Sequence, residues 1–495
     1  MKKLGERIVK ARHVILIVSI LLLIPAAIGY FNTRVNYDLL YYLPDGIDTM
    51  EGQDILMDEF HAGAFGIVMV DKMDDNNVSK LIEKMKKVDH VSKVLWYDSF
   101  ADSGIPKTML PDNVYDAFNK GTSTIMMVIF DDTSSGDGTM KAIKEIRSVT
   151  KHQCMISGIS AIVTDTKDLS EHETPIYVCI AVLLSVIILS LLMDSFMIPI
   201  FFLLSIGMAI VYNLGSNFIV GEISYITKAL AAVLQLGVTM DYSIFLWHSY
   251  EEQLEINGGN NKKAMSNAIT ATISSVVGSS ITTVAGFIAL CFMSFTLGLD
   301  LGVVMAKGVV LGVIACVTIL PSMILVFDKA IQKTKHRQLL PDFKRIPGFI
   351  TKHYKVFVVL FVLLLIPAIY GERNAKVYYD LSLSLPDSLE SVSAQNRLSK
   401  DYELGSANII LLSTETPKKD IKNLLDEVKK VDGVQTALGM ESFLDGSVPD
   451  SFIPEKLTSE LKSDKHEMMV FMSEYKTGSD EANTQCNDCL LYTSD

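Results

Sequence analysis

The sequence predicts a polytopic α-helical membrane protein of seven spans with two extracytoplasmic α/β domains, the second of them incomplete. Hydrophobic residues make up 49% of the 495 residues, although 20% are charged, and the mean hydropathy is +0.31. The charges must therefore be segregated from apolar runs, and runs long enough to cross a bilayer, about 20 residues, alternate with polar blocks. An internal repeat that contains one span and one polar block is the third observation behind this prediction.

Seven apolar runs are predicted to span the membrane. They cover residues 14–30, 176–193, 196–214, 223–247, 273–292, 301–327 and 356–370. Basic residues precede the first run, as they do in a signal peptide. Its pattern recurs inside the chain, where no signal peptide can lie, so we interpret it as a span.

The orientation follows from Lys and Arg in the short loops, which concentrate on the cytoplasmic side. The N-terminal segment and the connector at residues 328–355 are both basic. They lie on the same side if six spans separate them, so we expect a multi-pass protein of the cell (cytoplasmic) membrane with a cytoplasmic N-terminus. The expected domains are span 1 (1–30), outer domain 1 (31–175), spans 2–6 (176–327), a cytoplasmic connector (328–355), span 7 (356–370) and outer domain 2 (371–495).

The repeat aligns residues 21–45 with residues 363–387 without a gap. Asp38 matches Asp380, Leu-Pro-Asp ends both segments, and further matches follow downstream in the same order. One unit consists of a span, an outer domain and five more spans, and parallel repeats of this kind are typical of transporters. We expect a truncated second unit, because nothing near the end resembles the first domain's helical segment at 139–149 or its strand at 154–157.

The first outer domain alternates short apolar strands with amphipathic helices. The strands are expected at 66–70, 91–97, 124–130 and 154–157, and the helices at 78–87, 111–119 and 139–149. This order indicates a small α/β sandwich of ferredoxin-like kind.

Charge and cysteine content exclude other classes. A net charge of −13 argues against a nucleic-acid partner. The six cysteines are scattered and show no disulfide framework. A single CxxC at Cys486 and Cys489, without a second pair or a nearby His, is a weak metal signal. We expect no cofactor, no metal site and no catalytic residues.

The fourth span contains an acid, Asp241, with apolar residues on both sides. An ionised Asp near the bilayer centre costs about 2.5–3.5 kcal/mol on insertion scales. An apolar setting favours the neutral form, so such a group can exchange protons where an exposed Asp stays charged. The adjacent Tyr242 offers a hydroxyl donor to a partner carboxylate. The structural alternative is a hydrogen bond between packed helices, but intramembrane acids are rare and usually functional, which favours a proton relay.

Other polar residues in the spans are weaker candidates. Lys307 could pair with Asp241 or line a wet cavity, or it could extend its amine toward the interface or a backbone carbonyl. Ser280 and Thr283 could line the same path, although small hydroxyl residues more often mediate helix packing. Thr239 lies two residues before Asp241, so a shared helix face is not assured.

The segment GVTMDYSIFL at residues 237–246 resembles the Gly-x-x-x-Asp-Tyr motif on the fourth span of MMPL-type members of the RND (resistance-nodulation-division) superfamily. The segments at 278–290 and 305–322 and the arrangement of one plus five spans around a large outer domain are similar as well. The resemblance implies an RND-like fold with porter domains outside the membrane and makes Asp241 and Tyr242 half of a proton relay. It also implies that proton flow drives export of lipids or hydrophobic and amphiphilic compounds, with protons, membrane lipids and the exported molecule as partners and with a possible homo-oligomer.

The same resemblance leaves two alternatives open, a lipid-sensing or receptor-like protein and an accessory of protein export. An intramembrane aspartyl protease is disfavoured, because its chemistry needs two carboxylates at one site and only Asp241 lies deep in a span.

Overall fold

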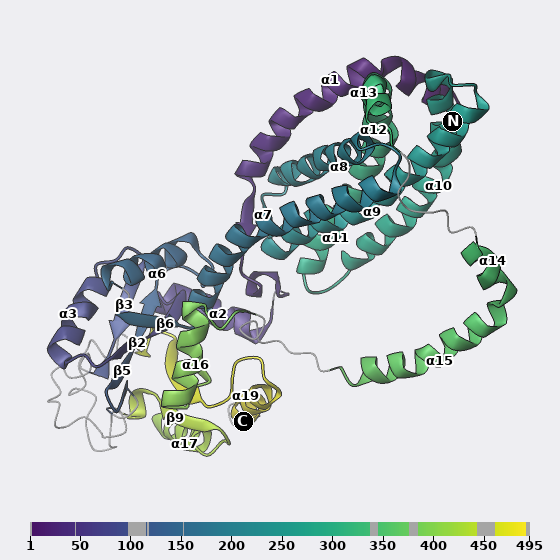
Figure 1. Cartoon of the computed structure of the whole chain (residues 1–495). Coiled ribbons are helices and arrows are strands. Elements are labelled where there is room, and N and C mark those ends of the chain that lie inside the picture. Colours follow the sequence, from purple (N-terminus) through teal and green to yellow (C-terminus); the bar gives the residue numbers. More distant parts are fainter. Residues whose placement is uncertain are drawn as a thin grey trace. The chain divides into compact units, whose positions relative to one another are not determined.

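The computed structural model describes residues 2–44, 46–97, 115, 118–151, 153–336, 345–375, 385–442 and 461–491. Its contacts divide the chain into two units (Figure 1). The helical unit comprises Met1–Pro44 and Ser170–Asn374, and the α/β unit comprises Asp45–Leu169 and Ala375–Asp495.

The helical unit holds the apolar runs expected from the sequence. Among the described residues, seven helical segments are long and apolar enough to cross a membrane. They are α1 (Lys2–Asn32), α7 (Ile159–Leu192), α8 (Met197–Gly215), α9 (Tyr225–Ile256), α10 (Asn261–Leu290), α11 (Leu297–Ile314) with its continuation, and α15 (Tyr354–Arg373). The chain is therefore a multi-pass helical membrane protein.

The sixth segment is not a uniform α-helix. After α11 the chain forms a π-helical stretch, η4 (Ala315–Ile319), and then α12 (Leu320–Val326). Pro321 is the second residue of α12, and π-helical turns inside helices are rare and frequently occur at functional sites.

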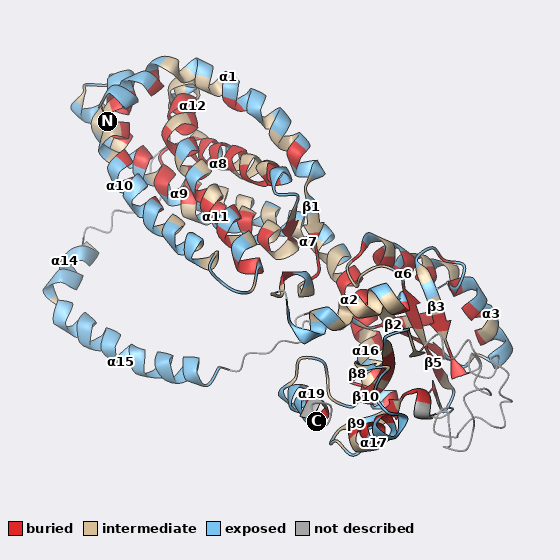
Figure 2. Cartoon of the chain, turned by 180° about the vertical axis from the view of Figure 1, so that it is seen from behind, coloured by how far each residue is buried: buried red, intermediate tan, exposed pale blue. Residues whose placement is uncertain are grey.

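Burial distinguishes central from peripheral helices (Figure 2). The most apolar window is 56% buried in α8 and 61% buried in the α11–α12 segment, but 11% or less in α1, α7 and α10 and 0% in α15. The exposed side chains of the peripheral helices are largely apolar. This distribution is the one expected of a bundle whose outer faces contact lipid or other helices rather than water.

A small polar structure follows α1. Strand β1 (Arg34–Asn36) pairs in parallel with β7 (Glu222–Ser224), just before α9. Asp38, from the repeated segment, accepts a hydrogen bond of 2.8 Å from the backbone of Leu40 and so fixes the short helix η1 (Leu40–Tyr42). Its repeat partner Asp380 lies outside the described residues.

The first half of the α/β unit is an antiparallel sheet with the order β3-β5-β2-β6, and β4 is paired to β5. The strands are β2 (Ala64–Asp71), β3 (Val91–Leu95), β4 (Asn119–Lys120), β5 (Ser123–Phe130) and β6 (Cys154–Ser157). These confirm the four predicted strands. Most of the helix predicted at 111–119 lies outside the described residues, and Asn119 itself begins β4.

Two amphipathic helices, α3 (Asp75–Met85) and α6 (Asp137–Val149), cover this sheet. Asp74 caps α3 by accepting a hydrogen bond from the Asn77 backbone, as an N-cap residue does. The buried side chains of α3 recur at helical spacing and join those of the strands in one hydrophobic core.

The second half repeats this succession in a smaller sheet with the order β8-β10-β9. Its elements are β8 (Ser406–Ser413), α17 (Lys418–Val428), β9 (Val434–Leu438), η6 (Met440–Ser442) and β10 (His466–Ser473). A further helix, α19 (Asp480–Leu491), follows at the position of α6 in the repeat.

Helix α19 corrects the expectation that no counterpart of the 139–149 helix exists. Its buried positions Ala482, Gln485 and Cys489 recur at helical spacing, and the Gln485 amide donates to the Asp432 backbone carbonyl over 2.7 Å. The helical spacing of buried positions is retained in α19 although the residues differ, so aligning residue identities does not detect this helix.

The two halves of the α/β unit also exchange their first helices, α2 (Asp48–Phe60) and α16 (Glu390–Tyr402). Both end at a left-handed residue, His61 and Glu403. Helix α16 packs on β6, and its Leu398 and Tyr402 belong to the core of the first sheet. Reciprocally, Glu59 of α2 contacts the second half, as described below.

Candidate functional site

The candidate site lies on α9, where two adjacent residues face different directions. Ser224 caps the start of this helix by accepting a hydrogen bond from the Ile226 backbone. Asp241 is near the middle of α9 and is exposed, whereas Tyr242 is buried at 6% exposure. Successive residues of an α-helix are about 100° apart, so one helix presents both groups in different directions.

Asp241 belongs to an exposed stripe of α9 that is largely apolar. The other exposed members of this stripe are Leu230, Val233, Leu234, Gly237, Phe245 and, toward the end of the helix, the polar His248. No described side chain is recorded within hydrogen-bond or ion-pair distance of the Asp241 carboxylate.

Tyr242 points into the bundle core together with Leu246 and Trp247. The same cluster contains Ala315, Cys316 and Val317 of the π-helical stretch. The irregular turn of the sixth segment therefore lies in the same core as the residue next to Asp241.

Thr239, expected as a possible relay residue, is on the buried face at 1% exposure. Its hydroxyl bonds the Gln235 carbonyl in its own helix over 2.5 Å. A side chain at Gly312 of α11 would meet the Thr239 methyl group at 2.0 Å. Thr239 thus mediates close packing between α9 and α11, on the side away from Asp241.

Lys307 is in the bundle interior but does not pair with Asp241. Its amine donates to the side-chain oxygen of Asn217. Asp300, the other charged residue of α11, accepts hydrogen bonds from the backbone of Ser224 over 2.8 Å and from the Thr227 hydroxyl over 2.6 Å. The sequence alone did not predict these partners, because amide and hydroxyl side chains in apolar helices gave no sign of which charge they meet.

Ser280 and Thr283 of α10 contact neither Asp241 nor Lys307 through a hydrogen bond, and their hydroxyls bond carbonyls of their own helix. The buried Ser280 hydroxyl bonds the Val276 carbonyl over 2.6 Å, and the exposed Thr283 hydroxyl bonds the Ser279 carbonyl over 3.2 Å. Ser280 also lines an apolar groove of about 360 Å³ between α10 and α11. The structure therefore does not bring the sequence-predicted candidates together around one centre.

The α/β unit contains a buried charged cluster that the sequence analysis missed. Arg147 of α6 makes two hydrogen bonds to Asp165 of α7, over 2.6 and 3.1 Å, and its Nε lies 3.1 Å from Glu390. The Ser391 backbone donates to the same Asp165 carboxylate over 3.0 Å. Because Glu390 and Ser391 begin α16, the cluster joins the two halves of the unit at the start of α7.

The charge state of this cluster follows from opposing effects. Burial by itself lowers the pKa of the Arg147 guanidinium, but the hydrogen bonds and charges of Asp165 and Glu390 outweigh burial and raise it. Arg147 is therefore a permanent cation between two acids. No sequence signal marked the cluster, because its members are far apart in the chain and common in polar domains.

Two more contacts join the halves. Arg397 of α16 binds Asp71 of β2 through two hydrogen bonds, over 2.5 and 3.1 Å, and these hold the pKa of the Asp71 carboxyl below its usual range. Glu59 of α2 lies 2.9 Å from His466 and also accepts a hydrogen bond from Ser463. Each exchanged helix thus carries a charged residue that contacts the opposite half.

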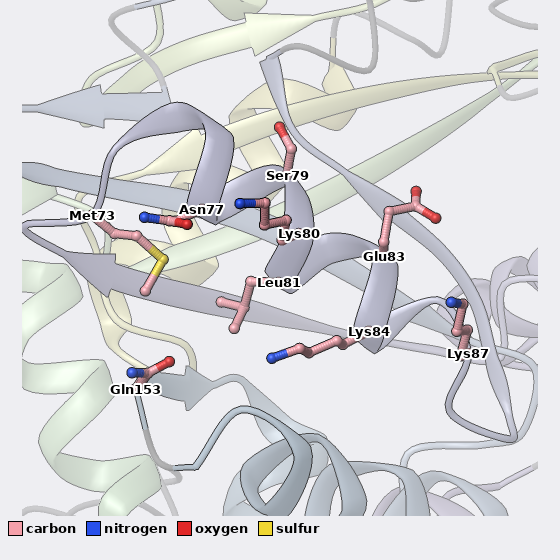
Figure 3. A pocket seen from close by; sticks show the side chains of 9 residues that line it. All are labelled: Met73, Asn77, Ser79, Lys80, Leu81, Glu83, Lys84, Lys87 and Gln153. Atoms are coloured by element: carbon pink, nitrogen blue, oxygen red, sulfur yellow. The ribbon is translucent and has the colours of Figure 1, made fainter.

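A basic pocket of about 700 Å³ lies along α3 (Figure 3). Lys80, Lys84 and Lys87 line it together with Glu83 and Gln153. Lysines at this spacing form a solvated helix face in most proteins, and no buried polar group reinforces the pocket.

Comparison with known proteins places this geometry in a family. The MMPL family model matches residues 67–350. The chain is 22% identical over 414 residues to putative membrane protein YdgH of Bacillus subtilis (strain 168), which covers 79% of this chain and 45% of YdgH. It is 32% identical over 115 residues to putative membrane protein MJ1562 of Methanocaldococcus jannaschii, or 23% of this chain and 27% of that protein.

A third relative carries a more specific description. The sulfolipid-1 exporter MmpL8 of Mycobacterium tuberculosis is 28% identical over 225 residues, which is 42% of this chain and 20% of MmpL8. The chain thus spans less than half the length of each of these curated relatives. A solved structure of SecDF aligns with a TM-score of 0.33 and 11% identity, over 66% of this chain and 39% of that one.

Proposed function

Because the chain belongs to the MMPL family, we propose that it is part of a transporter that exports lipids or other hydrophobic and amphiphilic compounds across the cytoplasmic membrane, driven by the proton-motive force. The description of MmpL8 as a sulfolipid exporter supports a lipid-like substrate. Transport, rather than catalysis, is the function that this proposal assigns.

The position of Asp241 is the observation that carries the proposal. It is the acid at the middle of α9, on an apolar stripe with no described partner. A charged Asp facing lipid would cost about 2.5–3.5 kcal/mol, so we infer that a helix of the second repeat covers this face in the assembled transporter. Under such a cover Asp241 alternates between its neutral and ionised forms and carries the driving proton.

The remaining candidates take supporting roles in this proposal. Tyr242 connects Asp241 to the core that contains the π-helical stretch, so protonation can bias the packing of that core. Ser280 lines the groove between α10 and α11. Lys307, Thr239 and Thr283 do not contact Asp241 in this structure, and we assign them to helix packing.

We further propose that the α/β unit consists of two ferredoxin-like porter domains outside the membrane, with residues 31–175 and 371–495 as their boundaries. The antiparallel order β3-β5-β2-β6 with α3 and α6 on the sheet supports the first assignment. The basic N-terminus and connector support a cytoplasmic N-terminus.

Helix α7 supplies the link between proton uptake and the porter domains. It is continuous from Ile159 to Leu192 and so begins in the α/β unit and ends in the helical unit. Asp165 near its start is fixed by Arg147, so a shift of α7 must move or break the contact with α16. Coupling of this kind requires two conformations of the protein whose relative populations depend both on the protonation of Asp241 and on the state of the porter domains.

The test is the export of lipid by cells that express the full-length protein. Asp241→Asn should abolish export while expression and membrane insertion stay normal, because an amide cannot exchange the proton. The matched control is Glu252→Gln, which removes an exposed acid from the end of the same helix and should leave export unchanged. Normal export by the Asp241 variant would overturn the proposal.

The inferred cover of α9 is tested separately. A cysteine replacing Val233, which is 48% exposed on the stripe, should be protected from a membrane-permeant thiol reagent. A disulfide between two copies through this cysteine would place a second copy of the chain, rather than the second repeat, on this face.

A further inference from the structure

The interior of the bundle contains a polar contact that involves a buried face of α9, different from the exposed face that carries Asp241. Asn213 of α8 donates its side-chain amide to the side-chain oxygen of Gln235 over 3.1 Å. Both residues are almost completely buried, at 1% and 3% exposure. Within an apolar bundle, two facing amides are costly unless their hydrogen-bonding capacity is satisfied.

That single hydrogen bond leaves capacity unused. The Asn213 side-chain oxygen and the Gln235 side-chain nitrogen have no hydrogen-bond partner among the described residues. The Asn213 oxygen is a hydrogen-bond acceptor and the Gln235 nitrogen is a donor. A group that can only donate, or only accept, would therefore satisfy just one of the two atoms. A group that donates to one and accepts from the other is required, and a water molecule does both.

The space for such a group is present. Asn213 and Gln235 line a small cavity together with apolar walls that include Met305 and Val309. The volume open to the centre of a water-sized sphere is about 10 Å³, close to the roughly 10–15 Å³ that one water molecule needs. Larger ligands do not fit.

Gly308 of α11 explains why the amides can approach α11 so closely. A side chain on Gly308 would lie 2.6 Å from the Asn213 amide nitrogen and 3.0 Å from the Gln235 oxygen. The absence of a side chain leaves room for the pair between α8, α9 and α11. One turn beyond Asn213, Asn217 extends the polar seam toward Lys307.

We propose that Asn213, Gln235 and Gly308 form a binding site for one ordered water molecule inside the membrane bundle. The water accepts a hydrogen bond from the Gln235 amide and donates one to the Asn213 oxygen. The water binds without help from Lys307 or another cation. A metal ion is disfavoured in this cavity, because the unpaired N–H donor of the Gln235 amide lines it and would repel a cation. The site is separate from Asp241, so it stands whether or not Asp241 carries protons.

The adjacent Met305 provides a sharp test. A brief X-ray pulse in aerated buffer converts bound water to hydroxyl radicals, which add to a neighbouring thioether, and dissolved oxygen then completes its two-electron oxidation to the sulfoxide. Met305 is 4% exposed, comparable to Met265 and Met323 at 0% and 4%, and these two do not line the cavity. In the purified full-length protein we expect Met305 to be oxidised several-fold more than either control.

Matched variants establish the cause. Combining Asn213→Leu with Gln235→Met removes both amides, and a cavity with apolar walls stays dry, so Met305 oxidation should fall to the level of the controls. Gln253→Met, farther along α9, should not change it. If Met305 and the controls are oxidised equally in the wild-type protein, the proposal is overturned.

A structure at a resolution that shows ordered water gives an independent answer that does not depend on how the variants fold. We expect density within hydrogen-bond distance of both amides. A cavity without density, or one filled by a rearranged Asn213 side chain, would contradict the site.

Discussion

At the scale of single residues, the contrast between Asp241 and Arg147 shows how burial and pairing decide what a charge does. Arg147 is enclosed with two acids and serves to hold the α/β unit together. Asp241 has no described partner and lies on an apolar face. The charge of Arg147 is balanced by partners within the structure, whereas the Asp241 carboxylate has no partner among the described residues. For this reason we assign the proton to Asp241.

The role of Arg147 leads to a stability prediction. Arg147→Met should destabilise the α/β unit by about 3–5 kcal/mol, because the buried Asp165 carboxylate would lose the guanidinium that balances its charge. The measurement is the unfolding of the protein in urea, monitored by circular dichroism. Lys144→Met is the control on the same helix, since its pair with Asp168 is exposed and is worth less than about 1 kcal/mol. Equal effects of the two variants would show that the Arg147 cluster is not buried.

The Asp71–Arg397 pair predicts a pH dependence. Because the pKa of Asp71 is lowered in the folded protein, the stabilisation it provides is fully present above the unfolded value of about 3.9 and is lost as the pH falls through the lower folded value. The thermal midpoint should therefore decrease below about pH 4. Asp71→Asn should flatten part of this decrease, and an unchanged acid profile in that variant would contradict the assignment.

At the scale of elements, close approach between α9 and α11 depends on glycine. Gly312→Ala should lower stability by about 1–3 kcal/mol, the usual effect of overpacking, because the new methyl group would overlap Thr239. Gly207→Ala on α8 meets nothing within 4 Å and should be neutral or slightly stabilising. The thermal midpoints of the purified variants test this, and a tolerated Gly312→Ala would mean that the two helices are not in close contact.

Element prediction from the sequence succeeded where local pattern determines structure. Apolar length identified the seven membrane helices, and short apolar runs identified β2, β3, β5 and β6. Helices α2 and α19 carry no comparable signal in the sequence, because their buried apolar positions are few and, in α19, partly small, as at Ala482 and Cys489. The partners of Lys307 and Arg147 could not be predicted, since they depend on tertiary contacts between residues distant in the chain.

The candidate site was predictable only in part for the same reason. The sequence identified Asp241 as an acid in an apolar span, and the structure adds which way it faces. It could not show that Thr239 and Lys307 lie on other sides of the bundle, because a helix position is known from sequence only relative to its own helix. The amide pair of Asn213 and Gln235 was likewise invisible until α8 and α9 were placed together.

At the scale of the whole molecule, the repeat is visible in both units: α1 and α15 correspond to each other in the helical unit, and the two sheets correspond to each other in the α/β unit. Each half of the α/β unit contributes its first helix to contacts with the other half, so neither half is structurally independent. Helix α7 belongs to both units, and its α/β end is held by the Arg147 cluster. We propose that proton binding at Asp241 changes helix packing in the membrane and that α7 transmits the change to the contacts of α16.

The most direct test of this account is transport by the full-length protein in liposomes under an imposed pH gradient. The gradient should accelerate lipid transport by the wild-type protein and by Glu252→Gln, and Asp241→Asn should show no response to it. Acceleration of transport in the Asp241 variant to the wild-type extent would show that this acid does not carry the driving proton.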